Sequence, residues 1–253
     1  MLAANRKSVI DAVQTVLSAD LSCSKADFQT EGVTIHKAEI REGRFRFPVR
    51  EQSLSIVTMG KGAVISCSAD RMEWAQKHLG SLTRDQLFSV HTLSKIESLV
   101  KQDGQLLAGP DQKYVCSVND AADFAIPEGI TISVQDRSTI AGLYTHTAFP
   151  HALSFNPNSP RPDRLAAVAE YGGIIVGIAG ASEDCELMWQ IGVDVLPEFQ
   201  SRGIGKALVG KLTRALFHEG IVPYYSASLS NMQSRQLAVS LGYWPAWIQI
   251  YAR

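Results

Sequence analysis

The sequence predicts an α/β (α+β) protein whose C-terminal half contains a mixed, mostly antiparallel sheet. Gly172-Gly173 lies between two runs of β-forming residues, 165–171 and 174–179, which is a strong signal for a hairpin. A second turn at 182–184 leads into a third strand, 186–195. The remaining elements of this half are expected in the order helix 203–219, strand 222–228, helix 231–241 and strand 243–250.

The N-terminal half predicts a smaller α/β arrangement. Its first segment has apolar residues at helical spacing, which is typical of an amphipathic helix rather than a signal peptide. Two short β-type runs around Gly60 and Gly62 indicate a hairpin, and two helices are expected near 70–79 and 84–101. Gly109-Pro110-Asp111 predicts a break before strands at 113–118 and 130–135. The apolar face of the first helix comprises Val9, Ile10, Val13, Val16 and Leu17.

Length and composition limit the classes of function. A chain of 253 residues can form two small domains, and we expect an N-terminal α/β domain at 1–126 and a second domain at 127–253. The formal net charge is −1, which argues against a nucleic-acid or membrane partner. No run of 18 apolar residues is present, so no membrane span is expected. The sequence does not indicate the role of the first domain.

The cysteines and histidines predict neither a metal site nor a disulfide framework. The four cysteines are far apart and form no CxxC pair, and the six histidines include no HExxH motif. Separated free thiols are typical of a reducing compartment, so we expect a cytoplasmic protein. The cysteines are Cys23, Cys67, Cys116 and Cys185.

A glycine turn between the third strand and the next helix predicts an anion-binding site. The turn reads Gln200-Ser201-Arg202-Gly203-Ile204-Gly205 and is followed by Lys206. The first amides of a helix have no intrahelical acceptor, and the helix dipole favours negative charge there. Glycines let a phosphate approach the backbone closely. The spacing fits neither a P-loop nor a dinucleotide fingerprint, and packing glycines at a helix start are the plainer alternative.

This order of elements resembles the GNAT superfamily of acyl-CoA-dependent N-acetyltransferases. The segment 200–205 matches the family signature [Q/R]-x-x-G-x-[G/A]. Asn231 opens the next helix and Leu241-Gly242-Tyr243 ends it, which is a second family element. The resemblance covers roughly residues 127–253 and implies the GNAT fold for them. The amino-acid sequences of the segments 189–195 and 242–247 also resemble those of a two-domain bacterial subgroup associated with resistance to zwittermicin-type aminopolyol antibiotics.

The resemblance implies how acetyl-CoA would bind. Its diphosphate would lie on the backbone amides from Arg202 to Lys206, and Asn231 would contact the pantetheine amides. Pantetheine would run beside the strand backbone near Val193 and Val195, since an exposed strand edge suits a ligand that carries amides. The predicted cofactor-binding residues are Val193, Val195, Gln200, Ser201, Arg202, Gly203, Ile204, Gly205, Lys206, Asn231 and Ser234.

The catalytic groups depart from the pattern that the resemblance implies. Many family members have a glutamate ten residues before the Q/R of the loop, where this chain has Gln190. On the helix expected at 231–241, Ala238 stands where the family usually has a tyrosine. Asp194 lies on the same strand face as Gln190 and is the predicted proton acceptor. The other candidate catalytic residues are Gln190, Glu186, Ser234 and Tyr243, with Tyr224, Tyr225, His146 and His151 as further options.

We therefore expect an acetyltransferase that moves an acetyl group from acetyl-CoA to a primary amine of a small molecule, by direct attack in a ternary complex. No activated cysteine motif suggests a covalent acyl-enzyme. Two alternatives stay open: a non-catalytic protein that binds or senses CoA, and a protein N-acetyltransferase. For assembly, the prediction allows a homodimer.

Overall fold

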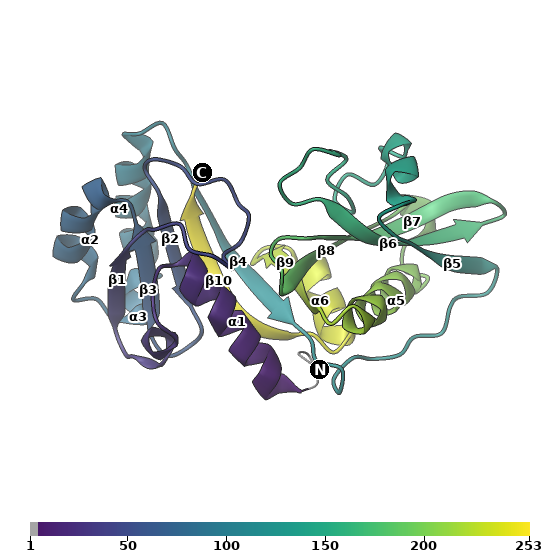
Figure 1. The fold of residues 1–253 in the computed structure, drawn as a ribbon, viewed down its shortest axis with the longest axis horizontal. Coiled ribbons are helices and arrows are strands. Elements are labelled where there is room, and N and C mark those ends of the chain that lie inside the picture. Colours follow the sequence, from purple (N-terminus) through teal and green to yellow (C-terminus); the bar gives the residue numbers. More distant parts are fainter. Residues whose placement is uncertain (1–4) are drawn as a thin grey trace. The chain divides into compact units, whose positions relative to one another are not determined.

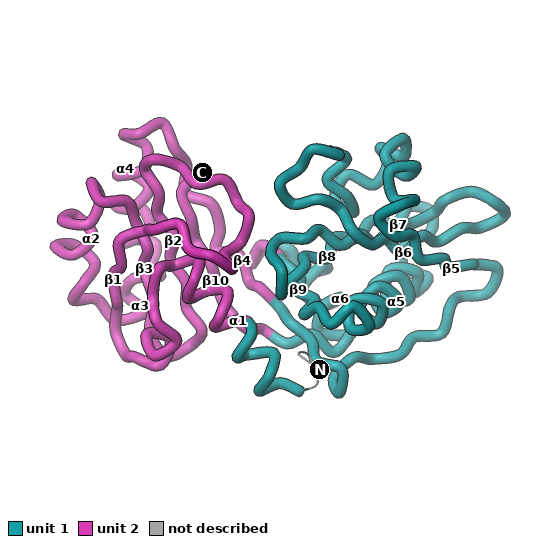
Figure 2. Tube along the Cα trace, in the orientation of Figure 1, with its two compact units in different colours: residues 1–12, 114–226, 231–244 teal, residues 13–113, 227–230, 245–253 magenta. Residues whose placement is uncertain are grey.

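The computed structural model describes residues 5–253, which form two compact units (Figures 1 and 2). Unit 1 takes the residues up to 12 together with 114–226 and 231–244. Unit 2 takes 13–113, 227–230 and 245–253. The predicted domains are continuous segments, whereas these compact units interleave along the chain. The reason is that the last strand pairs with a strand from the N-terminal half.

Unit 1 contains five sheet strands in the order β9-β8-β7-β6-β5, with two α-helices. Neighbouring strands from β5 to β8 pair antiparallel, whereas β8 and β9 pair parallel. The predicted mixed, mostly antiparallel sheet is confirmed. The elements are β5 Ile130–Gln135, β6 Asp163–Tyr171, β7 Ile174–Ser182, β8 Met188–Val195, α5 Ile204–His218, β9 Val222–Ser228 and α6 Met232–Ser240.

The predicted hairpin at Gly172-Gly173 joins β6 and β7. Both glycines have positive φ, 57° and 81°, as a two-residue hairpin turn requires. Helix α5 packs on β6, β7 and β8 with a face that includes Leu208, Leu212 and Leu216. A second apolar cluster contains residues of β6 and β7 with the segment 140–153, including the short 3-10 helix η3 (Ile140–Thr145) and Phe149. Loop residues therefore form part of the core of unit 1.

Unit 2 contains the strands β1, β3, β2, β10 and β4 in that spatial order. Its core lies between these strands and α2, α3 and α4, and it includes Ile56, Ile65 and Ile96. Helix α1 spans the ranges of both units, and four of its five predicted apolar positions are buried. The elements are α1 Arg6–Asp20, β1 Val33–Lys37, β2 Leu54–Thr58, β3 Ala63–Cys67, α2 Met72–Leu79, α3 Arg84–Leu87, α4 Val90–Lys101, β4 Leu107–Val115 and β10 Trp244–Ala252.

Two details of unit 2 differ from the sequence-based expectation. The helix expected at 84–101 is two helices, because Ser89 adopts an extended backbone and accepts a hydrogen bond from the amide of Thr92 as a new N-cap. The break expected at Gly109-Pro110-Asp111 lies inside β4. A Cβ at position 109 would lie 2.6 Å from the carbonyl oxygen of Gln249, so a glycine is required where β4 approaches β10.

All four cysteines are buried and free in the structure. Within residues 5–253, no helix has the length and apolar character that crossing a membrane requires.

Asp20, at the end of α1, provides a test of burial in unit 2. Burial raises the pKa of this carboxyl from 3.8 to about 6, although Arg44 lies 3.4 Å away and opposes the shift. Below pH 3.8 the carboxyl is protonated in both the folded and the unfolded chain. Between pH 3.8 and 6 only the unfolded chain releases the proton, so the stability of the fold falls as pH rises.

We therefore expect Asp20→Asn to have a larger free energy of unfolding than the parent at pH 7.5, by on the order of 1–3 kcal/mol. The difference should shrink towards zero as pH is lowered to 4, because the parent side chain is then also neutral. Urea unfolding of both proteins across this range measures it. If the difference in the free energy of unfolding stays constant with pH, the raised pKa of Asp20 is contradicted.

Candidate functional site

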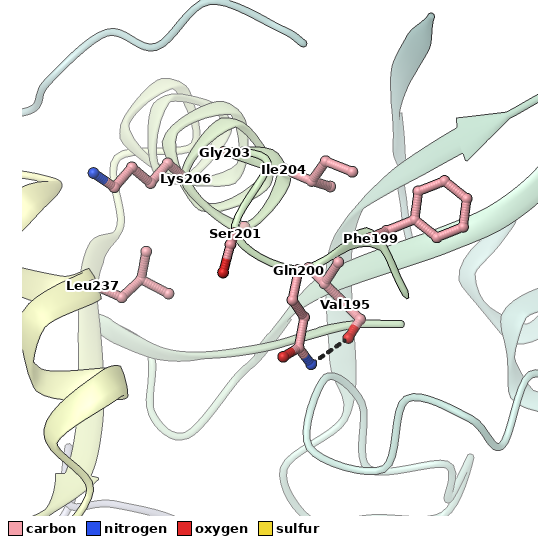
Figure 3. A pocket seen from close by; sticks show the side chains of 9 residues that line it. Val195, Phe199, Gln200, Ser201, Gly203, Ile204, Lys206 and Leu237 are labelled. Atoms are coloured by element: carbon pink, nitrogen blue, oxygen red, sulfur yellow. Dashed lines mark hydrogen bonds between the residues drawn. The ribbon is translucent and has the colours of Figure 1, made fainter. Parts of the chain in front are cut away.

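The loop between β8 and α5 has the backbone that the glycine turn predicts. Gly203 is the N-cap of α5 in the left-handed conformation, with φ 85°, and no side chain caps this helix. Ser201 also has positive φ, 60°. Gln200 Nε2 donates to the carbonyl of Val195 over 3.0 Å, which ties the loop to the end of β8 (Figure 3). The uncapped first turn of α5 therefore presents backbone N–H groups beside this loop.

A cavity of about 450 Å³ lies against this loop and the start of α5. Figure 3 shows the side chains of Gln200 and Ser201 from the loop facing the same space as Leu237 from α6. Seven predicted cofactor residues line the cavity, and Phe199 and Leu237 were not predicted. The lining residues are Val195, Phe199, Gln200, Ser201, Gly203, Ile204, Gly205, Lys206 and Leu237.

Four predicted cofactor residues do not line the cavity: Val193, Arg202, Asn231 and Ser234. The guanidinium of Arg202 lies over the ring of Phe199, 5.1 Å from its centre. Leu237 was missed because it lies inside α6, between the two ends of the helix to which the family pattern applies. Phe199 was missed because it precedes the signature by one residue.

Strand β8 extends beyond its parallel partner. The paired residues run from Met188 with Val222 to Ile191 with Tyr225, whereas β8 continues to Val195. Over these last residues β8 pairs with β7 on its other side. The edge of β8 facing away from β7 therefore has no β9 partner beyond Ile191, and this is the kind of edge that can bind the amides of an extended ligand.

Asn231 has the structural role that its position predicts. It is the N-cap of α6, and its side-chain Oδ1 accepts from the amide of Ser234 over 3.1 Å. Its Oδ1 is therefore occupied by the helix, and contact with a ligand would fall to its amide NH₂ group.

Asp194 is bound twice by one residue of an irregular loop. The backbone N–H of His151 donates to Asp194 Oδ2 over 2.6 Å, and His151 Nδ1 lies 3.0 Å from Asp194 Oδ1. The carboxylate side chain is 20% exposed, whereas the His151 side chain is 81% exposed. The sequence indicated both residues as catalytic candidates but did not pair them, since 43 positions separate them along the chain.

Two paired glycines allow that loop to lie directly on the sheet. Gly180 and Gly192 are partners across β7 and β8. A Cβ at Gly180 would lie 2.2 Å from the carbonyl oxygen of Ala152, and one at Gly192 would lie 2.0 Å from that of His151. Both distances are far below any real contact of a Cβ, so only glycine fits at either position. This glycine pair fixes the height of His151 above β8.

Gln190 belongs to a buried polar network instead of standing as an isolated replacement for a carboxylate. Tyr224 Oη lies 3.0 Å from Gln190 Oε1 and donates a short hydrogen bond to Asp184. Asp184 is fully buried and also accepts from Ser182 Oγ over 2.8 Å and from Arg161 over 3.4 Å. Burial, and then the charge of Asp184, raise the pKa of Tyr224 well above its ordinary value. Tyr224 therefore stays protonated and holds Gln190 in place.

The remaining predicted catalytic residues lie in different surroundings. Burial raises the pKa of Tyr225, a hydrogen bond with Ser234 lowers it, and the charge of Asp194 raises it further. Ser234 and Asp194 thus both interact with Tyr225. Tyr243 is buried, and its hydroxyl lies 2.7 Å from Thr213 Oγ1, which gives it a packing role away from the cavity lining. Glu186 is exposed ahead of β8.

The contact between the loop and Gly192 can be tested by substitution. We expect Gly192→Ala to lower the free energy of unfolding by about 1–3 kcal/mol, because the loop must move away from the added methyl group. Hydrogen exchange of residues 149–153 should become faster. Gly142→Ala is the matched control, since a Cβ there meets nothing within 4 Å. Equal stability of the two variants would contradict the close contact.

Comparison with known proteins shows which family part of this chain resembles. Residues 134–243 match the model of the family described as "Acetyltransferase (GNAT) family". No curated protein matches the chain. Among solved structures, a GCN5-related N-acetyltransferase-like protein from Streptococcus suis is 20% identical with a TM-score of 0.47, over 65% of this chain and 69% of that chain.

Two other solved structures differ in how much of the chain they cover. A protein from Drosophila is 15% identical with a TM-score of 0.47, over 99% of this chain and 90% of that one. The enzyme AAC(6')-Iy, solved with a bisubstrate analog, is 18% identical with a TM-score of 0.36, over 46% of this chain and 92% of that one. The family match covers the strands β6 to β9, the glycine loop and α6. The segment 134–243, which contains the glycine loop and every residue that lines the cavity, is thus similar to the GNAT family of acetyltransferases.

Proposed function

We propose that this protein transfers an acetyl group from acetyl-CoA to a primary amine of a small molecule. The observation that carries the proposal is the cavity of about 450 Å³ at the uncapped start of α5, within the segment that matches the acetyltransferase family. Backbone amides at a helix start favour a diphosphate. The small-molecule amine as acceptor follows from the sequence resemblance.

In this proposal the cofactor has three kinds of contact. The diphosphate lies on the amides from Arg202 to Lys206, and the side chains of these two residues add positive charge. Pantetheine runs beside the unpaired edge of β8, where Val193 and Val195 supply backbone groups. Leu237 and Ile204 give apolar contact within the cavity. Acetyl-CoA supplies the activated acyl group as a thioester.

The reaction is a direct transfer in a ternary complex. The neutral amine attacks the thioester carbonyl, a C–N bond forms and the C–S bond breaks. The nitrogen loses a proton and the thiolate sulfur gains one, so the products are the amide and free CoA. All four cysteines are buried, and burial raises the pKa of Cys23, Cys67 and Cys116, so none is available for an acyl-enzyme.

A protein that binds CoA without catalysis is the second candidate. It is favoured by Gln190, which cannot accept a proton and is held by Tyr224, and by Ala238, which is buried at the position of the usual tyrosine. Release of the CoA thiol that depends on an added amine separates the two candidates. A panel should contain polyamines, aminoglycosides, aminopolyols of the zwittermicin type and a peptide with a free N-terminus.

The expected result is amine-dependent release with at least one small molecule and none with the peptide. Release with the peptide alone would favour protein N-acetylation. Binding of CoA without release across the whole panel would favour the non-catalytic candidate.

Cofactor binding should depend on bare backbone at Gly203. We expect Gly203→Val to abolish CoA binding, measured by calorimetry and by the thermal shift that CoA causes, because a branched side chain fills the space at the helix start. Gly220→Val is the matched control: Gly220 follows α5, has φ 75° and meets nothing within 4 Å, so both variants carry similar backbone strain. Equal loss of CoA binding in both would refute the loop assignment.

A further inference from the structure

We propose that His151 accepts the proton of the attacking amine and that Asp194 holds the imidazole in the orientation this requires. The inference rests on the proposed acetyl transfer and changes the role that the sequence predicted for Asp194, from proton acceptor to positioning residue. It is carried by the two contacts between these residues, 2.6 Å to the backbone N–H and 3.0 Å to the ring.

The carboxylate of Asp194 is already occupied as an acceptor. Oδ2 accepts from the backbone N–H of His151, and Oδ1 faces Nδ1 of the same residue. A carboxylate can only accept, so Nδ1 carries the ring proton, and the neutral imidazole offers Nε2 as its acceptor. The ring is largely exposed while the carboxylate is not. Nε2 is therefore the atom of this pair that an incoming ammonium group can reach.

The pair lies at the part of β8 where the cofactor is proposed to bind. Successive side chains of a strand point to opposite faces. Val195 faces the cavity, so Asp194 points to the opposite face, where the loop with His151 lies on Gly192. Both features belong to the stretch of β8 beyond Ile191, where pairing with β9 ends. The acetyl donor and the proton acceptor, His151, would thus lie on the two faces of the same short stretch of β8.

The position of His151 is set by the core and not by its exposed side chain. Its neighbours Phe149 and Ala152 are buried in the apolar cluster of the segment 140–153. Its carbonyl oxygen lies against Gly192, and the next residue lies against Gly180. The backbone is therefore held on the sheet, and Asp194 fixes the ring. A base placed in this way does not depend on a mobile surface loop.

Other described groups near the pair fit the assignment less well. Gln190 cannot take a proton and is held by Tyr224. Tyr225 interacts with Asp194 and Ser234, and burial raises its pKa, so it stays protonated. Within residues 5–253, Asp194 is the charged group in contact with the His151 ring. Histidine is the side-chain type whose ordinary pKa lies nearest to neutral pH, which suits proton transfer at that pH.

The proton balance is complete without a further reactant. The ammonium form of the substrate gives one proton to His151 Nε2 and becomes the neutral amine. That amine attacks the thioester carbon, its second proton passes to the departing thiolate, and the amide and free CoA leave. The imidazolium of His151 then releases its proton to water.

The test compares His151→Gln and Asp194→Asn with the parent, using the amine that the panel identifies. At pH 7 we expect kcat/KM to fall roughly 10²-fold in both variants, the usual scale for a positioned base. The loss should shrink towards pH 9, where more of the amine is already neutral. The Kd for CoA, measured separately, should stay unchanged. His218→Gln, an exposed histidine at the C-terminal end of α5, is the matched control and should keep full turnover.

A spectroscopic measurement separates orientation from general stability. Nitrogen-15 shifts of the His151 ring should show the proton on Nδ1 in the parent. In Asp194→Asn the side-chain amide can donate to Nδ1, so the proton should move to Nε2 while CoA binding persists. This is the change that a purely structural role of Asp194 would not produce.

The outcomes distinguish this inference from the proposed function. If the parent acetylates an amine and His151→Gln keeps full turnover while Asp194→Asn loses it, Asp194 is the proton acceptor itself and the inference is overturned. If both variants keep full turnover across pH 6–9, neither residue takes the proton. If the parent binds CoA but acetylates no amine, the proposed transfer fails and the inference fails with it.

Discussion

The end of the parallel pairing between β8 and β9 is the constraint on which the functional part of the structure depends. The two strands pair from Met188 to Ile191, and β8 then continues alone on that side to Val195. A strand edge must either bind another backbone or face solvent. Here the same stretch leads directly into the glycine loop and the start of α5, so an unpaired edge and an uncapped helix terminus lie together.

On the opposite face of β8 there is a close backbone contact in place of a cavity. Gly180 and Gly192 allow the backbone of residues 151 and 152 to lie on the sheet at distances that no Cβ tolerates. That contact brings the amide and ring of His151 to Asp194. One strand thus lines the cavity with one face and carries the pair of His151 and Asp194 on the other, and the proposed acyl transfer would use both faces.

Buried polar groups stabilise the start of β8. Asp184 is fully buried and receives hydrogen bonds from Tyr224, Ser182 and Arg161. A buried carboxylate is tolerated only when such partners satisfy it. Because Tyr224 also contacts Gln190, the residue that replaces a usual glutamate belongs to the structural support of the site. In the proposed transfer the proton acceptor therefore comes from the pair of Asp194 and His151.

The sequence by itself determined the order of elements in the C-terminal half, the hairpin at Gly172-Gly173 and the loop that lines the cavity. These features are local: strand alternation, paired glycines and a helix start are set by neighbouring residues. Only the tertiary structure decided that β10 pairs with β2, so that the compact units interleave along the chain. It also decided that His151 binds Asp194, that Tyr243 is buried against Thr213 and that Leu237 faces the cavity. These contacts join residues tens of positions apart, and no local pattern encodes them because they depend on how the sheet, the loop and the helices pack together.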